Sequence, residues 1–190
     1  EIGLMELKAQ KKYLKILKEI SVERENAFIK ILPNQNLSID YTIDYPGTIV
    51  GNQNILIKNI DEDSFRKNLA DCRTFTFASE LDDLRTNGII KGGSLDNAVV
   101  FGKNNLLNQE GLKFDNEPAR HKALDAIGDL YLCGYSLLGH VVAYCAGHSL
   151  MHELVRKIFS DNDNWELVSG NEFSSYSSQP IIDSINSLNL

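Results

Sequence analysis

The sequence predicts an α+β fold, a two-layer sandwich in which two main helices cover one face of a mostly antiparallel sheet. Two observations predict this fold. Short apolar or alternating runs, which are typical of strands, dominate the first part of the chain, and two longer segments with helical spacing follow in the second part. Two layers of this kind bury their apolar faces against each other.

The strand predictions rest on apolar runs bounded by turn residues. Residues 37–44 alternate strictly, so the odd-numbered positions from 37 to 43 should face the core. The turn 33–36 between this run and the apolar run 27–32 predicts a hairpin of the two strands. Further strands are expected within residues 4–19 and at 54–58, 98–101 and 137–144.

Helices are predicted from their ends and from their periodicity. Residues 117–133 end at a glycine, Gly134, and residues 149–159 carry apolar side chains at helical spacing. In the first of these helices Leu124, Ile127 and Tyr131 form the expected core-facing stripe. Shorter helices are predicted at 61–70 and 79–87.

Composition excludes several functional classes. The 190 residues suffice for one domain, or for one domain with extensions, and the net charge of −7 without a basic block excludes a nucleic-acid partner. No apolar run reaches about 18 residues, so we expect no transmembrane segment. There is no secretory signal pattern, and three cysteines without CxxC spacing indicate reduced thiols in a cytoplasmic protein.

A polar stripe on the predicted helix 117–133 carries candidate chemistry. His121, Asp125 and Asp129 are four residues apart and therefore lie on one helical face. An imidazole and a carboxylate at this spacing can bind one metal ion from one side, although a catalytic zinc normally has three protein ligands. Spacing alone favours the alternative, a surface imidazole that shares a hydrogen bond with a carboxylate, because HxxxD is a weak pattern.

His148 follows Gly147 at a junction between a strand and a helix, where a side chain is exposed beside backbone N–H groups. It is a candidate general acid or base, and the alternative is a residue that only begins the helix. A helix N-terminus favours the neutral imidazole, so a protonated His148 needs a neighbouring carboxylate, for which Asp129 is the candidate. His140 and His152 are interpreted as ordinary strand and helix residues.

Residues 73–77 combine hydroxyls with aromatic rings. Thr74 could donate to a developing oxyanion, and Phe75 and Phe77 could stack on a base or sugar. The alternative is a strand with buried aromatic side chains. The turn at Gly93 and Ser94 could let backbone approach a ligand closely, or could be a plain turn.

Five motifs lie, in order, at residues 73–77, 92–94, 107–112, 120–130 and 146–150. Together they resemble those of the UDP-3-O-acyl-N-acetylglucosamine deacetylases, the zinc amidases of lipid A synthesis in Gram-negative bacteria. The similarity covers roughly residues 10–170. It implies an enzyme of two similar α+β domains with the active site between them, of which this chain resembles the second.

The resemblance implies a division of the chain. Residues 1–15 would be the tail of a missing preceding domain and a linker, and residues 16–160 the second domain, with an insert at about 73–93. Residues 161–190, rich in Ser, Asn and Asp, would form a loosely ordered tail. The resemblance also implies a cytoplasmic location.

The resemblance further implies roles for the candidate residues. His121 and Asp125 would be Zn²⁺ ligands, His148 the general acid oriented by Asp129, and Thr74 the group that stabilises the oxyanion. The third zinc ligand and the general base would come from the missing N-terminal domain, so this chain alone should be inactive. Contacts with the substrate, UDP-3-O-acyl-N-acetylglucosamine, are implied for Lys122, Phe75, Phe77, Gly93 and Ser94, with Lys122 near the UDP part.

Two departures from the family pattern affect the substrate site. Cys145 and Met151 stand where the resemblance leads us to expect a lysine and an asparagine, and both changes concern contacts with the diphosphate. The alternative hypothesis is therefore a non-catalytic nucleotide-sugar-binding module derived from the enzyme. Binding of UDP without any zinc requirement would distinguish it.

Overall fold

The computed structural model describes residues 9–80 and 97–170. Within these ranges, seven strands form one mixed sheet, and two further strands form a small parallel pair beside it. The strands are β1 (Lys12–Ile16), β2 (Ile20–Arg24), β3 (Ala27–Leu32), β4 (Leu37–Tyr45), β5 (Gly51–Ile57), β6 (Thr74–Phe77), β7 (Ala98–Phe101), β8 (Ser136–Tyr144) and β9 (Trp165–Ser169). The helices are α1 (Glu62–Asn68), α3 (Glu117–Leu130) and α4 (His148–Phe159), with 3₁₀ turns η1 (Tyr131–Cys133) and η2 (Asn162–Asn164).

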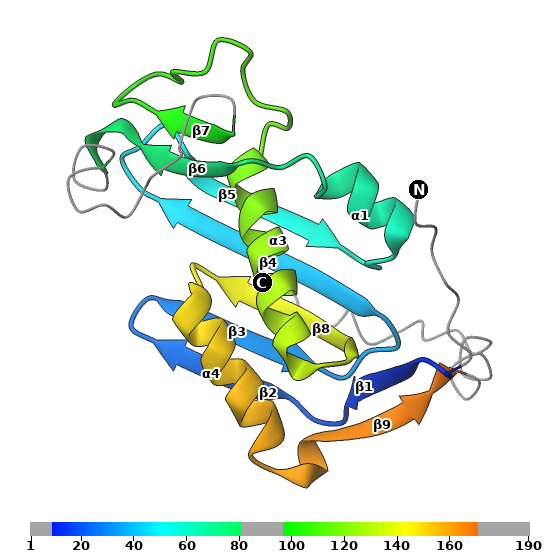
Figure 1. Ribbon diagram of the computed structural model, residues 1–190. Helices are drawn as coiled ribbons and strands as arrows, with labels where there is room; N and C mark the ends of the chain where they lie inside the picture. Colours follow the sequence, from blue (N-terminus) through cyan, green and yellow to red (C-terminus); the bar gives the residue numbers. More distant parts are fainter. Residues whose placement is uncertain (1–8, 81–96, 171–190) are drawn as a thin grey trace, which may run out of the picture.

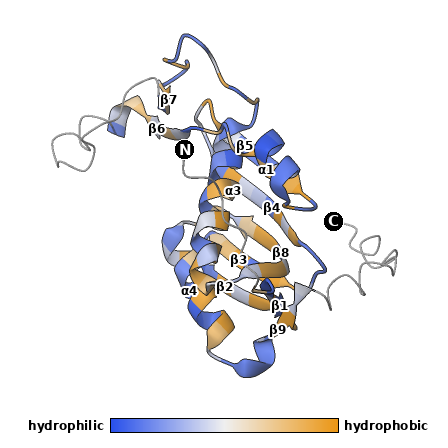
Figure 2. Cartoon of the chain, turned by 45° about the vertical axis from the view of Figure 1, so that its right-hand side comes forward, coloured by the Kyte–Doolittle hydropathy of each residue, from blue (hydrophilic) through white to orange (hydrophobic). Residues whose placement is uncertain are grey.

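Helices α3 and α4 lie side by side on one face of the main sheet, which is the predicted α+β sandwich (Figure 1). Four of the six strand pairs in that sheet are antiparallel, so the prediction of a mostly antiparallel sheet is confirmed. Figure 2 shows α4 with hydrophobic and hydrophilic residues alternating along it. Its apolar stripe, which includes Leu150, Leu154 and Ile158, is buried.

Strand β8 is the centre of the sheet. It runs parallel to β4 on one side, and on the other side it pairs first with β1 and then with β3. At the position between these two partners stands Gly139, where an added Cβ would come within 2.9 Å of the Ile31 side chain. The missing side chain therefore lets Ile31 pack directly onto the β8 backbone.

The predicted hairpin of residues 27–32 and 37–44 is wrong. These residues form β3 and β4, but β8 lies between the two strands and pairs with both. The turn reverses the chain direction without joining neighbouring strands, because the apolar β8, about 100 residues later in sequence, takes the place between them, where its Leu138, Val141 and Ala143 are buried. The hairpin that forms instead joins β2 to β3 through Glu25, whose φ is 48°.

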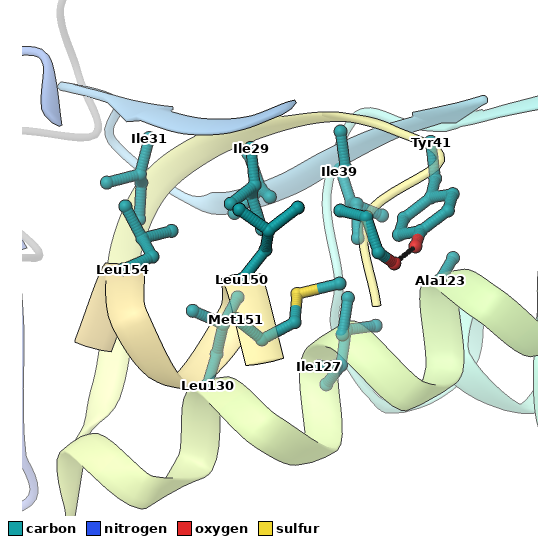
Figure 3. Packing of buried hydrophobic residues seen from close by; sticks show 14 of the residues in the cluster. Ile29, Ile31, Ile39, Tyr41, Ala123, Ile127, Leu130, Leu150, Met151 and Leu154 are labelled. Atoms are coloured by element: carbon teal, nitrogen blue, oxygen red, sulfur yellow. Dashed lines mark hydrogen bonds between the residues drawn. The ribbon is translucent and has the colours of Figure 1, made fainter. Parts of the chain in front are cut away.

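The buried face of α3 differs from the predicted stripe. Ile127 is buried as expected, but Tyr131 belongs to η1 and is 61% exposed, and Leu124 is only half-buried. Small side chains dominate the face that touches the sheet, which lets the helix axis approach the strands closely. Figure 3 shows Ala123, Ile127 and Leu130 of this face packed with residues of α4 and the sheet.

The last described segment is more ordered than its composition suggests. Strand β9 pairs along its whole length with β1, and Trp165 packs on Phe159 with ring centroids 5.3 Å apart. The expectation of a loosely ordered tail is therefore wrong for residues 165–169, because backbone pairing with an edge strand does not need apolar side chains. Residues 171–190, most of the predicted helix 79–87 and the turn at 92–94 lie outside the described residues.

Candidate active site

Helix α3 and the start of α4 bring four of the predicted site residues together. His121, Asp125 and Asp129 lie along α3 as their spacing predicts, and His148 is the first residue of α4. The chain leaves β8 through Cys145, whose φ of 48° turns it toward α3. The buried Tyr41 hydroxyl donates to the carbonyl of Ala146 and fixes this turn (Figure 3).

His121 and Asp125 place an imidazole nitrogen and a carboxylate oxygen side by side, and zinc binds both kinds of atom; we call these two residues the donor pair. Nε2 of His121 lies 3.3 Å from Oδ1 of Asp125, and the two side chains are 16% and 21% exposed. Two ligand atoms on a tetrahedral zinc, each at about 2.0–2.1 Å, are about 3.3–3.4 Å apart. The observed separation therefore suits two adjacent ligands of one such ion.

The protonation state of His121 also suits a ligand. Burial lowers the pKa of His121, opposed by the negative charge of Asp125 and by hydrogen bonding with the backbone of Cys72. The contact with the Cys72 backbone is not a well-formed hydrogen bond, because the buried Nδ1 of His121 has no hydrogen-bond partner among the described residues. The ring is thus favoured in its neutral form, which is the form that binds metal.

Asp125 is shared between several partners. Its Oδ1 faces His121, while its Oδ2 accepts a hydrogen bond from Nζ of Lys122 at 3.0 Å. The same Oδ2 lies 3.9 Å from Nε2 of His148. The imidazole of His148 is therefore directed at the side of the site where the His121–Asp125 donor pair lies.

His148 and Asp129 form a dyad. Nδ1 of His148 lies 2.6 Å from Oδ2 of Asp129, and because an ionised carboxylate only accepts, Nδ1 is the donor. The His148 side chain is 59% exposed, whereas that of Asp129 is 15% exposed. The carboxylate that the sequence required beside a protonated His148 is thus the one it predicted, while the other ring nitrogen, Nε2, lies 3.9 Å from Oδ2 of Asp125.

Asp129 has a second imidazole partner that the sequence interpretation missed. Nε2 of His152 lies 3.3 Å from Oδ1 of Asp129. His148 and His152 are four residues apart and so share one face of α4, which is the spacing that could have revealed this contact. His140, by contrast, is bonded to the Ser38 hydroxyl in the sheet, as expected of an ordinary strand residue.

The residues predicted around β6 fall into two groups. Thr74 begins the strand and is exposed, two residues after Cys72, whose backbone acts on His121. Phe75 and Phe77 are half-buried and pack against Tyr45 and Phe101, with ring centroids 5.6–6.2 Å apart. The aromatic packing foreseen as the alternative is therefore present, and Gly93 and Ser94 lie outside the described residues.

A buried ion pair close to the site was also missed. Glu117 is fully buried, and its carboxylate accepts from the guanidinium of Arg73 at 3.0 Å and from the backbone N–H groups of Arg73 and Lys113. Burial raises the pKa of Glu117, but these hydrogen bonds outweigh it and lower the pKa below its ordinary value. The pair fixes β6 to the beginning of α3.

One groove among the described residues lies away from these side chains. It measures about 690 Å³ and runs between α1, the end of α3 and strands β1 and β4. None of the predicted site residues lines it. In the same part of the chain, no group of three or more His, Cys, Asp or Glu side chains is arranged to hold a metal ion.

The fold and the site together define a class of protein. It is an α+β protein in which the His148–Asp129 dyad lies beside the His121–Asp125 donor pair, an arrangement suited to hydrolysis. Residues 1–160 match the family model described as LpxC, UDP-3-O-acyl N-acetylglycosamine deacetylase. The chain belongs to this family, as the resemblance predicted. No helix in the part that the structure describes is long and apolar enough to cross a bilayer.

Curated relatives support the assignment. The chain is 41% identical over 178 residues to a protein of Syntrophotalea carbinolica, 40% over 172 residues to one of Campylobacter fetus subsp. fetus, and 38% over 169 residues to one of Shewanella violacea. Each is named UDP-3-O-acyl-N-acetylglucosamine deacetylase. The matches cover 88–94% of this chain but 55–58% of the relatives, so the chain spans about half their length.

Proposed function

We propose that this chain forms part of a zinc-dependent enzyme that removes the acetyl group of UDP-3-O-acyl-N-acetylglucosamine, a step of lipid A synthesis. The observation that carries the proposal is the placing of His148 between two carboxylates. Asp129 holds its Nδ1 at 2.6 Å, and its Nε2 lies 3.9 Å from the Asp125 carboxylate of the donor pair. The names of the relatives supply the substrate class.

His121 and Asp125 would hold the zinc ion. Their donor atoms are an imidazole nitrogen and a carboxylate oxygen, both suited to zinc, at the separation expected of adjacent ligands. When bound, zinc would polarise the acetamide carbonyl and lower the pKa of a water molecule. Asp125 keeps one oxygen for Lys122, which restrains the carboxylate in its position.

His148 would act as the general acid. In its protonated form it donates from Nδ1 to Asp129 and offers the Nε2 proton to the departing amine nitrogen as the C–N bond breaks. The negative charge of Asp129 offsets the unfavourable position of a cation at the beginning of α4. The exposed hydroxyl of Thr74 would donate to the oxygen that gains charge as the amide carbon becomes tetrahedral.

Two further groups are required, and we propose that they come from outside the described residues. Two donors fall short of the three protein ligands usual for catalytic zinc. The family resemblance assigns the third ligand and the general base to a preceding domain, of which residues 1–15 would be the tail. On this proposal residues 16–160 alone bind zinc weakly and do not turn over substrate.

Metal analysis of the protein carrying the site variants tests the proposal. His121→Ala and Asp125→Ala should each lower zinc content and deacetylase activity together, while His140→Gln, a histidine change in the sheet, should leave both unchanged. Activity that survives complete loss of zinc in His121→Ala would refute the zinc dependence. Zinc that stays bound in both variants would refute the ligand assignment.

Cys145 favours a second candidate, a nucleotide-sugar-binding module without catalysis. Its half-buried thiol has a pKa raised by burial and is neutral where the resemblance leads us to expect a lysine cation. Retained UDP binding in a protein that never takes up zinc would favour this candidate.

A further inference from the structure

We propose that Tyr41 is a positioning residue, which holds the turn before α4 and so keeps the His148 imidazole against Asp129. Tyr41 lies on β4 and is fully buried, and its hydroxyl donates to the carbonyl of Ala146, two residues before His148 (Figure 3). Nδ1 of His148 lies 2.6 Å from Oδ2 of Asp129. The catalytic consequence rests on the proposed function, but the placing of the ring does not.

The turn between β8 and α4 is held by two neighbouring residues of β4. The N–H of Cys145 donates to the carbonyl of Thr42 at 2.9 Å, and the carbonyl of Ala146 accepts from Tyr41. Cys145 has a φ of 48°, in the left-handed region that a residue other than glycine rarely adopts. Such a conformation persists only where the surrounding contacts impose it, and these two hydrogen bonds are contacts of that kind.

The beginning of α4 has little other restraint. Among the described residues, no side chain caps the helix at Gly147, and a Cβ placed there would meet no atom within 4 Å. Glycine also adopts more backbone conformations than other residues do. Without the Tyr41 hydroxyl, the Ala146 carbonyl would lose its donor, and the peptide bond between Ala146 and Gly147 could rotate to find another.

The body of α4 should not follow this rotation. Leu150, Met151 and Leu154 are buried in the core, so the helix keeps its place on the sheet. The His148 side chain is 59% exposed, so core packing does not fix its ring. A displacement of about 1 Å would separate Nδ1 from Asp129, and a misplacement of this size can lower a catalytic rate by up to about 10²-fold.

Tyr144 provides a matched control close to the same turn. It is the last residue of β8, and its hydroxyl donates to the carboxylate of Asp44 on β4 at 3.0 Å. Tyr41→Phe and Tyr144→Phe therefore each remove one hydroxyl and one hydrogen bond that involves β4. Both keep the aromatic ring, so both variants should fold, but the bond of Tyr41 is the one that reaches the peptide leading into α4.

NMR of the natural protein with labelled histidine tests the proposal without any assay of activity. In Tyr41→Phe, the nuclear Overhauser contacts between the His148 ring and the Asp129 side chain should be weakened or lost. In Tyr144→Phe they should keep their wild-type strength. Unchanged contacts in Tyr41→Phe, or an equal loss in Tyr144→Phe, would overturn the proposal.

Kinetics then test the catalytic consequence. Tyr41→Phe should lower kcat by about 10-fold and leave KM and zinc content unchanged, because the ring still reaches its working position part of the time and the donor pair is not altered. Tyr144→Phe should leave kcat unchanged.

A double variant shows whether Tyr41 acts through His148. In a His148→Ala background, Tyr41→Phe should have no further effect on kcat, since the ring that it positions is absent. A loss of kcat that persists undiminished in this background would overturn the proposal. Weakened Overhauser contacts with an unchanged kcat in Tyr41→Phe would leave the positioning role standing and refute His148 as the general acid.

Discussion

The two halves of α3 both carry acidic side chains, but the surroundings differ in kind. At the beginning of the helix, Glu117 is fully buried and accepts from one guanidinium and two backbone N–H groups. In the second half, Asp125 and Asp129 are partly exposed and face three imidazoles and one ammonium. The first set of partners cannot change protonation near neutral pH, and most of the second set can.

The kind of partner distinguishes the structural carboxylate, Glu117, from those of the candidate active site, Asp125 and Asp129, more clearly than the degree of burial does. The Glu117 carboxylate is saturated by donors whose positions are set by β6 and the loop before α3, so it stabilises one geometry. The carboxylates of Asp125 and Asp129 instead contact imidazoles, a type of group that can change protonation near neutral pH and that, on the proposed function, includes a zinc ligand. Removing each kind of carboxylate partner should therefore change different measurable quantities.

The largest expected effect is on catalysis, from His148→Ala. The dyad would lose its proton donor, so kcat should fall by about 10²–10⁴. Zinc content should remain unchanged, since the ring is not part of the donor pair. The side chain is 59% exposed, so the free energy of unfolding should change by no more than about 0.5 kcal/mol. Steady-state kinetics, metal analysis and denaturant unfolding measure the three quantities, and near-normal turnover would contradict the assigned role.

Glu117→Ala should act on stability. It leaves the guanidinium of Arg73, 8% exposed, without its main partner, and breaking a buried pair in this way costs about 3–5 kcal/mol. Denaturant unfolding measures the loss. Glu110→Gln is the control, because Glu110 contacts the same guanidinium at 2.5 Å but is half-exposed, so its change should hardly move the unfolding midpoint. Similar losses of unfolding free energy in Glu117→Ala and Glu110→Gln would show that the buried carboxylate is no more important to stability than the exposed one.

The same anchor predicts sensitivity to acid. The pKa of Glu117 is lowered in the folded state relative to its ordinary value of 4.5, so the unfolded chain binds more protons at low pH. The stabilisation is complete above the ordinary value and is lost as the pH falls through it toward the folded pKa. The free energy of unfolding, measured between about pH 6 and pH 3, should decline less steeply in Glu117→Gln than in the wild type. Parallel curves for the two proteins would show that Glu117 is not the group responsible.

Short-range features were predictable from the sequence, and long-range partners were not. The 3.6-residue period placed His121, Asp125 and Asp129 on one face, and the electrostatics of a helix N-terminus led to the contact between His148 and Asp129. The pairing of β3 with β8 rather than with β4 depends on which distant strand fills the centre of the sheet, and local turn chemistry carries no information about that.

The partner of Glu117 escaped prediction for a related reason. Arg73 is 44 residues away in sequence, and a buried ion pair has no local pattern that distinguishes it from two surface charges. His152 was missed although its spacing from His148 was available, because its role depends on the side chain of a neighbouring helix. The candidate reactive residues were thus easier to predict from the sequence than the residues that hold them in place.

The smallest expected effect, Arg120→Lys, sharpens the comparison within α3 itself. Arg120 precedes His121 but belongs to the anchoring half: its Nη1 donates to the backbone and side-chain oxygens of Asn68, and its guanidinium stacks on Phe114 at 4.3 Å. A lysine keeps the charge but loses the planar fork, so stability should fall by about 1–2 kcal/mol.

Arg66→Lys is the matched control for this change and should be nearly neutral, since within the described ranges the contact of Arg66 is an exposed ion pair with Glu62. Zinc affinity and kcat should not change in either variant, because the lost contacts join α3 to α1 and to the segment before α3. In Arg120→Lys, a loss of zinc-binding free energy larger than the loss of unfolding free energy would show that Arg120 positions His121 directly. The boundary between the two halves of the helix would then lie before residue 120 rather than after it.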